Sequence, residues 1–207
     1  MKRVPIIIAA MAVVVATAVI ACNSNNNPSQ NKEGLALVDG ETETTSKESI
    51  IKRGEYLVTI MGCHDCHSPK VMTPQGPALD SALLLSGHPA SMPMPKVNME
   101  ALQSWVLFNH TNTAAVGPWG MSFSANITSD ETGIGNWTEA QFLKAIREGK
   151  YKGMDNTRPM LPPMPWAMLA KATDEDLKAI FAYLKSTAPV ENRVPANVPP
   201  DQIAKLN

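Results

Sequence analysis

The sequence has little charge of either sign and shows no internal repeat. Lys and Arg number 18 and Asp and Glu 19 in 207 residues, so the formal net charge is −1. No basic patch dominates, which excludes an electrostatic argument for nucleic-acid binding. Hydrophobic residues make up 44% of the chain, an ordinary globular composition, and the length favours one domain over two.

Cysteine is also scarce, and two of the three cysteines stand in the run Cys63-His64-Asp65-Cys66-His67. This CxxCH pattern is typical of covalent attachment of a c-type haem. Two thiols at this spacing can each bond one vinyl group of a porphyrin, and the histidine that follows can place an imidazole nitrogen on the iron. We therefore predict one covalent haem c, held by Cys63, Cys66 and His67.

Two other interpretations of the same motif are a thioredoxin-like redox pair and half of a zinc site. A zinc ion needs about four ligands, and the motif supplies three at most. A redox CxxC usually lies in a βαβ context, which the sequence around residues 50–70 does not indicate. Haem attachment remains the preferred interpretation.

The first 22 residues, MKRVPIIIAAMAVVVATAVIAC, have the pattern of an export signal: a basic start, an apolar stretch and small residues. The end of the stretch, Val19-Ile20-Ala21-Cys22, resembles the lipobox of bacterial lipoproteins, in which the cysteine becomes the lipid-bearing first residue. A transmembrane anchor is the alternative, but about 16 apolar residues are short for a span of about 20. We predict a signal peptide over 1–21 and lipid on Cys22. The protein is then exported and lipid-anchored to a bacterial membrane, facing the periplasm or the cell exterior.

We expect residues 22–46 to be a flexible tether, because they are polar and lack periodicity. A mainly α domain is expected over 47–190, followed by a C-terminal tail over 191–207. Its first helix should span 47–62, with Thr45 or Ser46 as the cap and Gly62 at its end. Gly54 inside this helix indicates that another helix crosses closely there.

Two further helices are predicted with clear caps. One runs from Thr138 to about Glu148, where Thr138 and Gln141 form a capping box and Gly149 closes the end. The last runs from Asp174 to about Ser186 after Thr173, with an apolar stripe on one side.

Residues 68–135 are rich in Pro and Gly and should be largely irregular. Within them, 99–108 is either a short helix or part of a hairpin in which 104–110 pairs with 121–127. The turn of that hairpin would be Gly117-Pro118-Trp119-Gly120, and the hairpin is favoured. So long an irregular segment should pack against something, and a haem offers a large apolar face.

The sixth iron ligand decides between an electron carrier and a haem protein with an open site. The residue types that can fill this position are methionine and histidine, and most of the twelve methionines should be core residues. The candidates are Met92, Met94, Met99, Met121, Met154, Met160, Met164, Met168, His88 and His110.

A helix that ends in CxxCH, a proline-rich loop with Met and a C-terminal amphipathic helix together resemble the class I cytochromes c. The resemblance implies that the first and last helices cross at Gly54 against Phe181 or Tyr183, and that the axial methionine precedes a proline, as Met164 precedes Pro165. The runs 161–166 and 125–137 resemble segments of the cytochrome subunits of bacterial membrane-bound dehydrogenases. This chain departs from those subunits because it holds one CxxCH where they hold several.

Flanking prolines favour Met164 as the sixth ligand, because they reduce the entropy that is lost when a weak thioether bond is held. Met160, four residues earlier, is the alternative. Other residues around the haem are less specific: Trp166, Tyr151 and Phe123 as lining, and Arg158 or Asn126 as propionate partners.

The function predicted from these features is electron transfer by a six-coordinate His/Met haem, not enzymatic catalysis. The partners would be a dehydrogenase or an oxidase, met by transient docking, or a complex of which the chain is a subunit. The alternative is a haem enzyme or gas sensor with an open or labile sixth site.

Overall fold

The structure is a computed structural model, and it describes residues 42–94 and 96–206. The predicted signal peptide, the lipid site at Cys22 and the tether up to residue 41 lie outside these residues. Among the helices that are described, none combines the length and the apolar character needed to cross a membrane.

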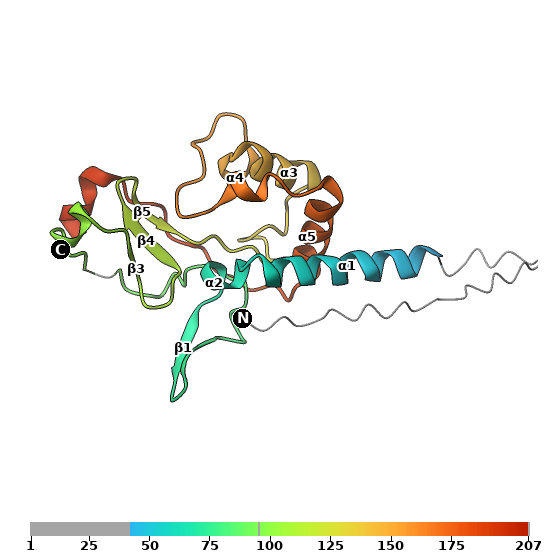
Figure 1. The fold of residues 1–207 in the computed structure, drawn as a ribbon, viewed down its shortest axis with the longest axis horizontal. Coiled ribbons are helices and arrows are strands. Elements are labelled where there is room, and N and C mark those ends of the chain that lie inside the picture. The colour runs from blue at the N-terminus through green and yellow to red at the C-terminus, as the bar shows by residue number, and fades with distance from the viewer. Residues whose placement is uncertain (1–41, 95, 207) are drawn as a thin grey trace, which may run out of the picture. The chain divides into compact units, whose positions relative to one another are not determined.

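The fold is mixed, with helices around one core and two small antiparallel sheets (Figure 1). This is compatible with the cytochrome c fold that the resemblance implies, although "mainly α" understates the strands. The α-helices are α1 (Thr42–Ile60), α2 (Cys63–His67), α3 (Glu139–Glu148), α4 (Trp166–Leu169) and α5 (Asp174–Ser186). The 3₁₀ helices are η1 (Ala101–Gln103), η2 (Tyr151–Gly153) and η3 (Pro200–Leu206).

Helix α1 begins at Thr42, earlier than the predicted start at residue 47. Thr45 and Ser46 lie inside the helix, so the prediction that one of them caps it was wrong. The predicted end was right, since Gly62 takes the left-handed conformation with φ 68°. A glycine adopts this conformation without the steric cost that a side chain adds.

Helices α3 and α5 have the predicted caps. The Thr138 hydroxyl accepts a hydrogen bond from the Gln141 backbone N–H at 3.2 Å, and Gly149 ends α3 in the left-handed conformation. In α5, the Thr173 hydroxyl accepts from the Asp176 N–H at 3.1 Å. Each cap satisfies a backbone donor that the first turn of a helix leaves unpaired.

Helices α1 and α5 cross at Gly54, as predicted. A Cβ atom built on Gly54 would lie 2.0 Å from the Ala179 carbonyl oxygen and 2.7 Å from Cβ of Tyr183. The partner residues are therefore Ala179 and Tyr183. Phe181 packs elsewhere, with its ring centroid 5.3 Å from that of Phe142 in α3.

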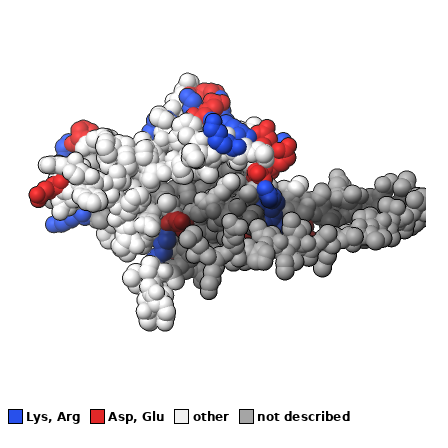
Figure 2. All heavy atoms as spheres, in the orientation of Figure 1, with Lys and Arg blue, Asp and Glu red and all other residues white. Residues whose placement is uncertain are grey.

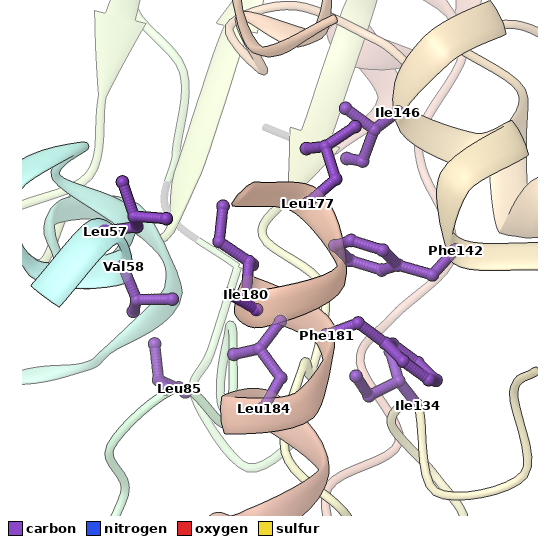
Figure 3. Close-up of a cluster of buried hydrophobic side chains, with 11 residues drawn as sticks. Leu57, Val58, Leu85, Ile134, Phe142, Ile146, Leu177, Ile180, Phe181 and Leu184 are labelled. Atoms are coloured by element: carbon purple, nitrogen blue, oxygen red, sulfur yellow. The ribbon is translucent and has the colours of Figure 1, made fainter. Parts of the chain in front are cut away.

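The main core lies between α1, α3 and α5 (Figure 3). It is formed by apolar side chains that each expose less than a tenth of their surface. They are Leu57 and Val58 of α1, Phe142 and Ile146 of α3, Leu177, Ala179, Ile180, Phe181 and Leu184 of α5, and Leu85 and Ile134 from loops.

All the strands lie within residues 68–135, the segment that was expected to be largely irregular. The first sheet pairs β1 (Lys70–Thr73) with β2 (Gly76–Leu79), a hairpin that was not predicted from the sequence. The second has the order β3 (Leu107–Phe108), β4 (Ala114–Gly117), β5 (Gly120–Phe123). Its turn is at 117–120 as expected, but β5 pairs with β4, so the predicted pairing of 104–110 with 121–127 was wrong.

A second, smaller core covers the sheet of β3, β4 and β5. It contains Val97, Val116, Met121, Val198 and Ile203. Met121 and Val198 form a β-bridge, so the segment after Pro189 packs on β5 instead of hanging free. This bridge pairs the free edge of β5, the strand that leads to Ser124 and Ala125.

Candidate functional site

The CxxCH motif forms helix α2, which follows α1 after the turn at Gly62. The Asp65 N–H donates to the Gly62 carbonyl at 3.0 Å, and Ser68 N–H donates to the His64 carbonyl at 3.2 Å. The motif is therefore held as one helical turn, with both cysteines half-buried.

Both thiols of the motif are in an environment that favours the protonated form. Burial raises the pKa of the Cys63 thiol to about 11 and also raises the pKa of Cys66. Reactive redox pairs have a lowered thiol pKa, so the structure disfavours the thioredoxin-like interpretation. Among the residues that the structure describes, no group of three or more His, Cys, Asp and Glu side chains is placed to hold a metal ion.

The imidazole of His67 is oriented by one hydrogen bond. Its Nδ1 lies 2.8 Å from the Ala125 carbonyl oxygen, which can only accept, so Nδ1 carries the proton. Burial lowers the pKa of His67, although the Ala125 carbonyl acts in the opposite direction. The neutral ring then has a free lone pair on Nε2, the form that binds iron.

Gly87 allows the Ala125 carbonyl to lie close to His67. Its N–H donates to the His67 carbonyl at 2.8 Å, and its φ is +77°. A Cβ atom on Gly87 would lie 2.4 Å from the Ser124 carbonyl oxygen and 2.5 Å from the Ala125 carbonyl carbon. A side chain at this position would therefore push the Ala125 carbonyl away from His67.

Three sulfur-bearing candidates lie at the edge of the main core. Cys63, Met160 and Met164 are all partly buried and pack against it. Cys63 of the motif and the two favoured methionines thus pack against the same core cluster. This sulfur and imidazole donor set, with a protonated Nδ1 on His67, fits a c-type haem.

The other sixth-ligand candidates have less suitable surroundings. Met94, Met99, Met154 and Met168 are exposed, and Met121 is buried in the second core. The Met92 sulfur accepts from the Asn109 amide at 3.6 Å, and His110 is exposed. His88 is fully buried among residues that pack on β5.

The loop that carries Met160 and Met164 is tied at several points. The Met160 N–H donates to the Gly149 carbonyl at 2.7 Å, and the Trp166 indole packs where Gly149 has no side chain. Nearer Met164, the Ser122 hydroxyl of β5 donates to the Pro162 carbonyl at 2.7 Å. Ser122 was not predicted, because a single serine in a strand carries no signal for a contact 40 residues away.

The two residues suggested as propionate partners have other roles. The buried Asn126 amide donates to the Val190 carbonyl and the Thr132 hydroxyl, and its oxygen accepts from Thr128. The Arg158 guanidinium lies 3.9 Å from the centroid of the Tyr151 ring and donates to Asn197. Both side chains are thereby engaged in holding loops.

No protein-family model matches the chain. It is 31% identical to the gluconate 2-dehydrogenase cytochrome c subunit of Pantoea cypripedii, over 77% of this chain and 30% of that protein. It is 29% identical to the alcohol dehydrogenase (quinone) cytochrome c subunit of Gluconobacter oxydans, over 72% of this chain and 24% of that protein.

A third relative is the fructose dehydrogenase cytochrome subunit of Gluconobacter japonicus. The chain is 30% identical to it, over 69% of this chain and 22% of that protein. In all three comparisons this chain spans less than a third of the other protein's length.

Proposed function

Since the homologues of this chain are cytochrome c subunits of dehydrogenases, we propose that it transfers electrons through one covalent haem c with His67 and Met164 as axial ligands. The observation that carries the proposal is the hydrogen bond from His67 Nδ1 to Ala125, which leaves Nε2 free in a CxxCH helix. When bound, the haem supplies an iron that alternates between the ferrous and ferric states.

The two cysteines hold the group. Each would do so through a thioether bond to one vinyl group, with the thiol hydrogen kept on the second vinyl carbon, so that no atom would be lost. The thiols are protonated at neutral pH, because burial raises the pKa of both. Both cysteines lie in one helical turn, a spacing that suits attachment to a single porphyrin.

Met164 is the preferred sixth ligand because its backbone is restricted on both sides. Pro162, Pro163 and Pro165 surround it, and Ser122 holds the Pro162 carbonyl. Both restrictions reduce the entropy lost when a weak thioether bond is held. With both axial positions filled, a substrate has no open site, so we propose a carrier and not an enzyme.

A redox partner, either a dehydrogenase or an oxidase, would dock transiently beside α2. The β1–β2 hairpin directly follows α2 and exposes Val71, Met72 and Leu79, with 70% of Met72 accessible. Residues 71–79 carry no charge. Figure 2 shows acidic and basic side chains at the region of α3 and α5 and at the base of the hairpin, whereas the outer part of the hairpin shows none in this view. An apolar surface of this kind suits a small, short-lived interface.

We also propose that the protein is exported and anchored to a bacterial membrane by lipid on Cys22. The support is the export signal and the run Val19-Ile20-Ala21-Cys22. The test is Cys22→Ser in a bacterial host that is fed labelled fatty acid. Loss of the label and release from the membrane fraction are expected, and a labelled, membrane-bound variant would contradict lipidation at this residue.

The haem proposal is tested with the protein produced in a host that attaches c-type haem. The wild type should keep its haem after acid–acetone extraction and should show, when oxidised, the weak sulfur-to-iron band at the red end of the visible spectrum. Met164→Ala should lose this band, and Met160→Ala is the matched control that should keep it. The reverse result would transfer the ligand to Met160. Rapid binding of carbon monoxide by the reduced wild type would instead favour the enzyme or sensor interpretation.

A further inference from the structure

Asn192 lies in the segment that follows α5, and its side chain bonds to backbone groups more than 100 positions earlier. Its amide nitrogen Nδ2 donates to the Ser86 carbonyl at 2.7 Å and to the His88 carbonyl at 2.9 Å. Its Oδ1 accepts a hydrogen bond from the Ala90 N–H at 2.9 Å. Because carbonyls only accept and a backbone N–H only donates, these partners fix which end of the amide is nitrogen. Both amide protons and the amide oxygen of Asn192 are therefore engaged.

The bond to Ser86 acts on the peptide unit that contacts His67. The Ser86 carbonyl and the Gly87 N–H belong to one planar trans peptide, in which they point in opposite directions. The Gly87 N–H donates to the His67 carbonyl at 2.8 Å. This peptide unit thus lies between the Asn192 amide and the backbone of His67. Loss of the bond on the Asn192 side would let the unit tilt away from His67.

Residues 85–88 are also joined to the segment that orients the His67 ring. Two backbone hydrogen bonds, each of 2.9 Å, connect them to residues 124–127. Between these two bonds, Gly87 packs directly on the Ala125 carbonyl, whose oxygen would lie 2.6 Å from a Cβ atom on the glycine. A displacement around Gly87 therefore reaches the Ala125 carbonyl, which accepts the hydrogen bond from Nδ1 of His67.

The segment after α5 supports the other side of this contact as well. Asn126, directly after Ala125, is 5% exposed, and its amide nitrogen donates to the Val190 carbonyl at 2.8 Å. Residues 190 and 192 thus bond to both of the segments whose backbone meets His67. This part of the chain is a common support for the two groups that contact the histidine.

We propose that Asn192 is a positioning residue for the axial histidine: by holding the Ser86–Gly87 peptide, it keeps the Ala125 carbonyl on Nδ1 of His67. This inference rests on the proposed haem function. A histidine that donates to a carbonyl is a more basic ligand, and it stabilises ferric iron more than a histidine without this partner. Loss of the Asn192 amide should therefore raise the reduction potential of the haem. If Asn192 only fastened the end of the chain, its loss would lower the stability and leave the potential unchanged.

The test is Asn192→Leu in the holoprotein. Leucine has nearly the size and branching of asparagine but no donor, and its apolar branch leaves water little room to replace the amide. The reduction potential should rise. In proton NMR of the reduced protein, the Nδ1 proton of His67 should exchange with solvent roughly tenfold faster than in the wild type. Asn197→Leu is the matched control, because it makes the same chemical change in the same segment, where the lost partner is the Arg158 guanidinium. Both measurements should be unchanged in this control.

Urea unfolding of both variants separates positioning from stability. If Asn192→Leu keeps its haem and shows neither the higher potential nor the faster exchange, the inference is wrong. Equal shifts in Asn192→Leu and Asn197→Leu would also overturn it, because they would reflect a general loosening of the segment. A wild-type protein without covalent haem would overturn the proposed function as well, whereas a haem protein with unchanged measurements would overturn only the role of Asn192.

A second variant covers the case in which Asn192→Leu does not fold. Asn192→Ala removes the same amide but admits water, which can replace part of the lost hydrogen bonding. It should raise the potential and speed the exchange of the His67 Nδ1 proton by smaller amounts than expected for leucine. An Asn192→Ala protein that holds haem and shows neither change would overturn the inference.

Discussion

Replacing Gly87 with alanine tests the structural basis of the site most directly. The φ of +77° at this residue is one that side chains rarely adopt, and the new Cβ atom would lie 2.4 to 2.6 Å from backbone atoms of Ser124 and Ala125. Backbone atoms in a packed segment cannot rotate away as a flexible side chain can. The substitution should therefore displace the Ala125 carbonyl from His67.

The cost has two parts. Placing alanine in a left-handed conformation costs roughly 1–2 kcal/mol. Forcing a methyl group into a packed site adds roughly 1–3 kcal/mol. The sum is about 2–5 kcal/mol. At roughly 2–4 °C of Tm per kcal/mol for a chain of this size, a loss of about 3 kcal/mol lowers the Tm by about 6–12 °C.

Gly76→Ala is the matched control. Gly76 has φ +112°, and nothing lies within 4 Å of a Cβ atom built on it, so alanine there adds strain without crowding. In urea unfolding of the holoprotein, Gly87→Ala should lose about 1–3 kcal/mol more than Gly76→Ala. Its reduction potential should also rise, because His67 without its carbonyl partner is a less basic ligand and stabilises the ferric iron less. Equal losses of stability in the two variants, with equal potentials, would refute the reasoning.

Three further predictions concern the supports of the fold and the loop. Gly54→Ala should destabilise the protein by several kcal/mol in urea unfolding, because the Cβ atom of the alanine would lie 2.0 Å from the Ala179 carbonyl oxygen. A variant as stable as the wild type would mean that α1 and α5 can separate at little cost. Ser122→Ala removes the donor to the Pro162 carbonyl. It should lower the free energy of unfolding by about 1 kcal/mol and speed the binding of azide to the ferric protein. An unchanged rate of azide binding would show that the loop does not depend on Ser122. Thr173→Ala removes the cap of α5 and should lower the stability by about 1 kcal/mol, measured by thermal unfolding. Thr173→Ser keeps a capping hydroxyl and should restore the lost stability.

The sequence could predict the elements whose signals are local. Helix α5 begins and ends where its cap and apolar stripe indicate, because both signals lie within a few residues of the helix. The start of α1 was harder to predict, because its first residues include several Thr and Ser, each of which could also cap a helix. The close crossing at Gly54 was also predictable, because a glycine inside a helix needs a compensating contact.

The β1–β2 hairpin has a local signal in the sequence. Thr73-Pro74-Gln75-Gly76 has proline at the second and glycine at the fourth position, a pattern typical of a type I turn. The structure pairs Thr73 with Gly76 across this turn. The two strands around it are only four residues each, and their exposed apolar side chains obscure the usual alternation.

The contacts that orient the site could not be predicted, because they involve the backbone. The Ala125 carbonyl and the Gly87 N–H act through groups that every residue except proline possesses. Nothing in the sequence distinguishes these two residues until the fold places them beside His67. The residues proposed to bind the haem, Cys63, Cys66 and His67, could be named in advance because their types and spacing are specific.

The hydrogen bond between His67 and Ala125 also constrains the order of events during maturation. The two residues are 58 positions apart, and closing a loop of that length costs roughly 3–4 kcal/mol of chain entropy plus a constant. One hydrogen bond contributes only about 0.5–1.5 kcal/mol, so it cannot close the loop alone. The thiols of Cys63 and Cys66 lie within one helical turn and need no such closure. Under the proposed function, attachment of the haem to the two thiols does not require the intervening chain to be folded, whereas the contact between His67 and Ala125 does.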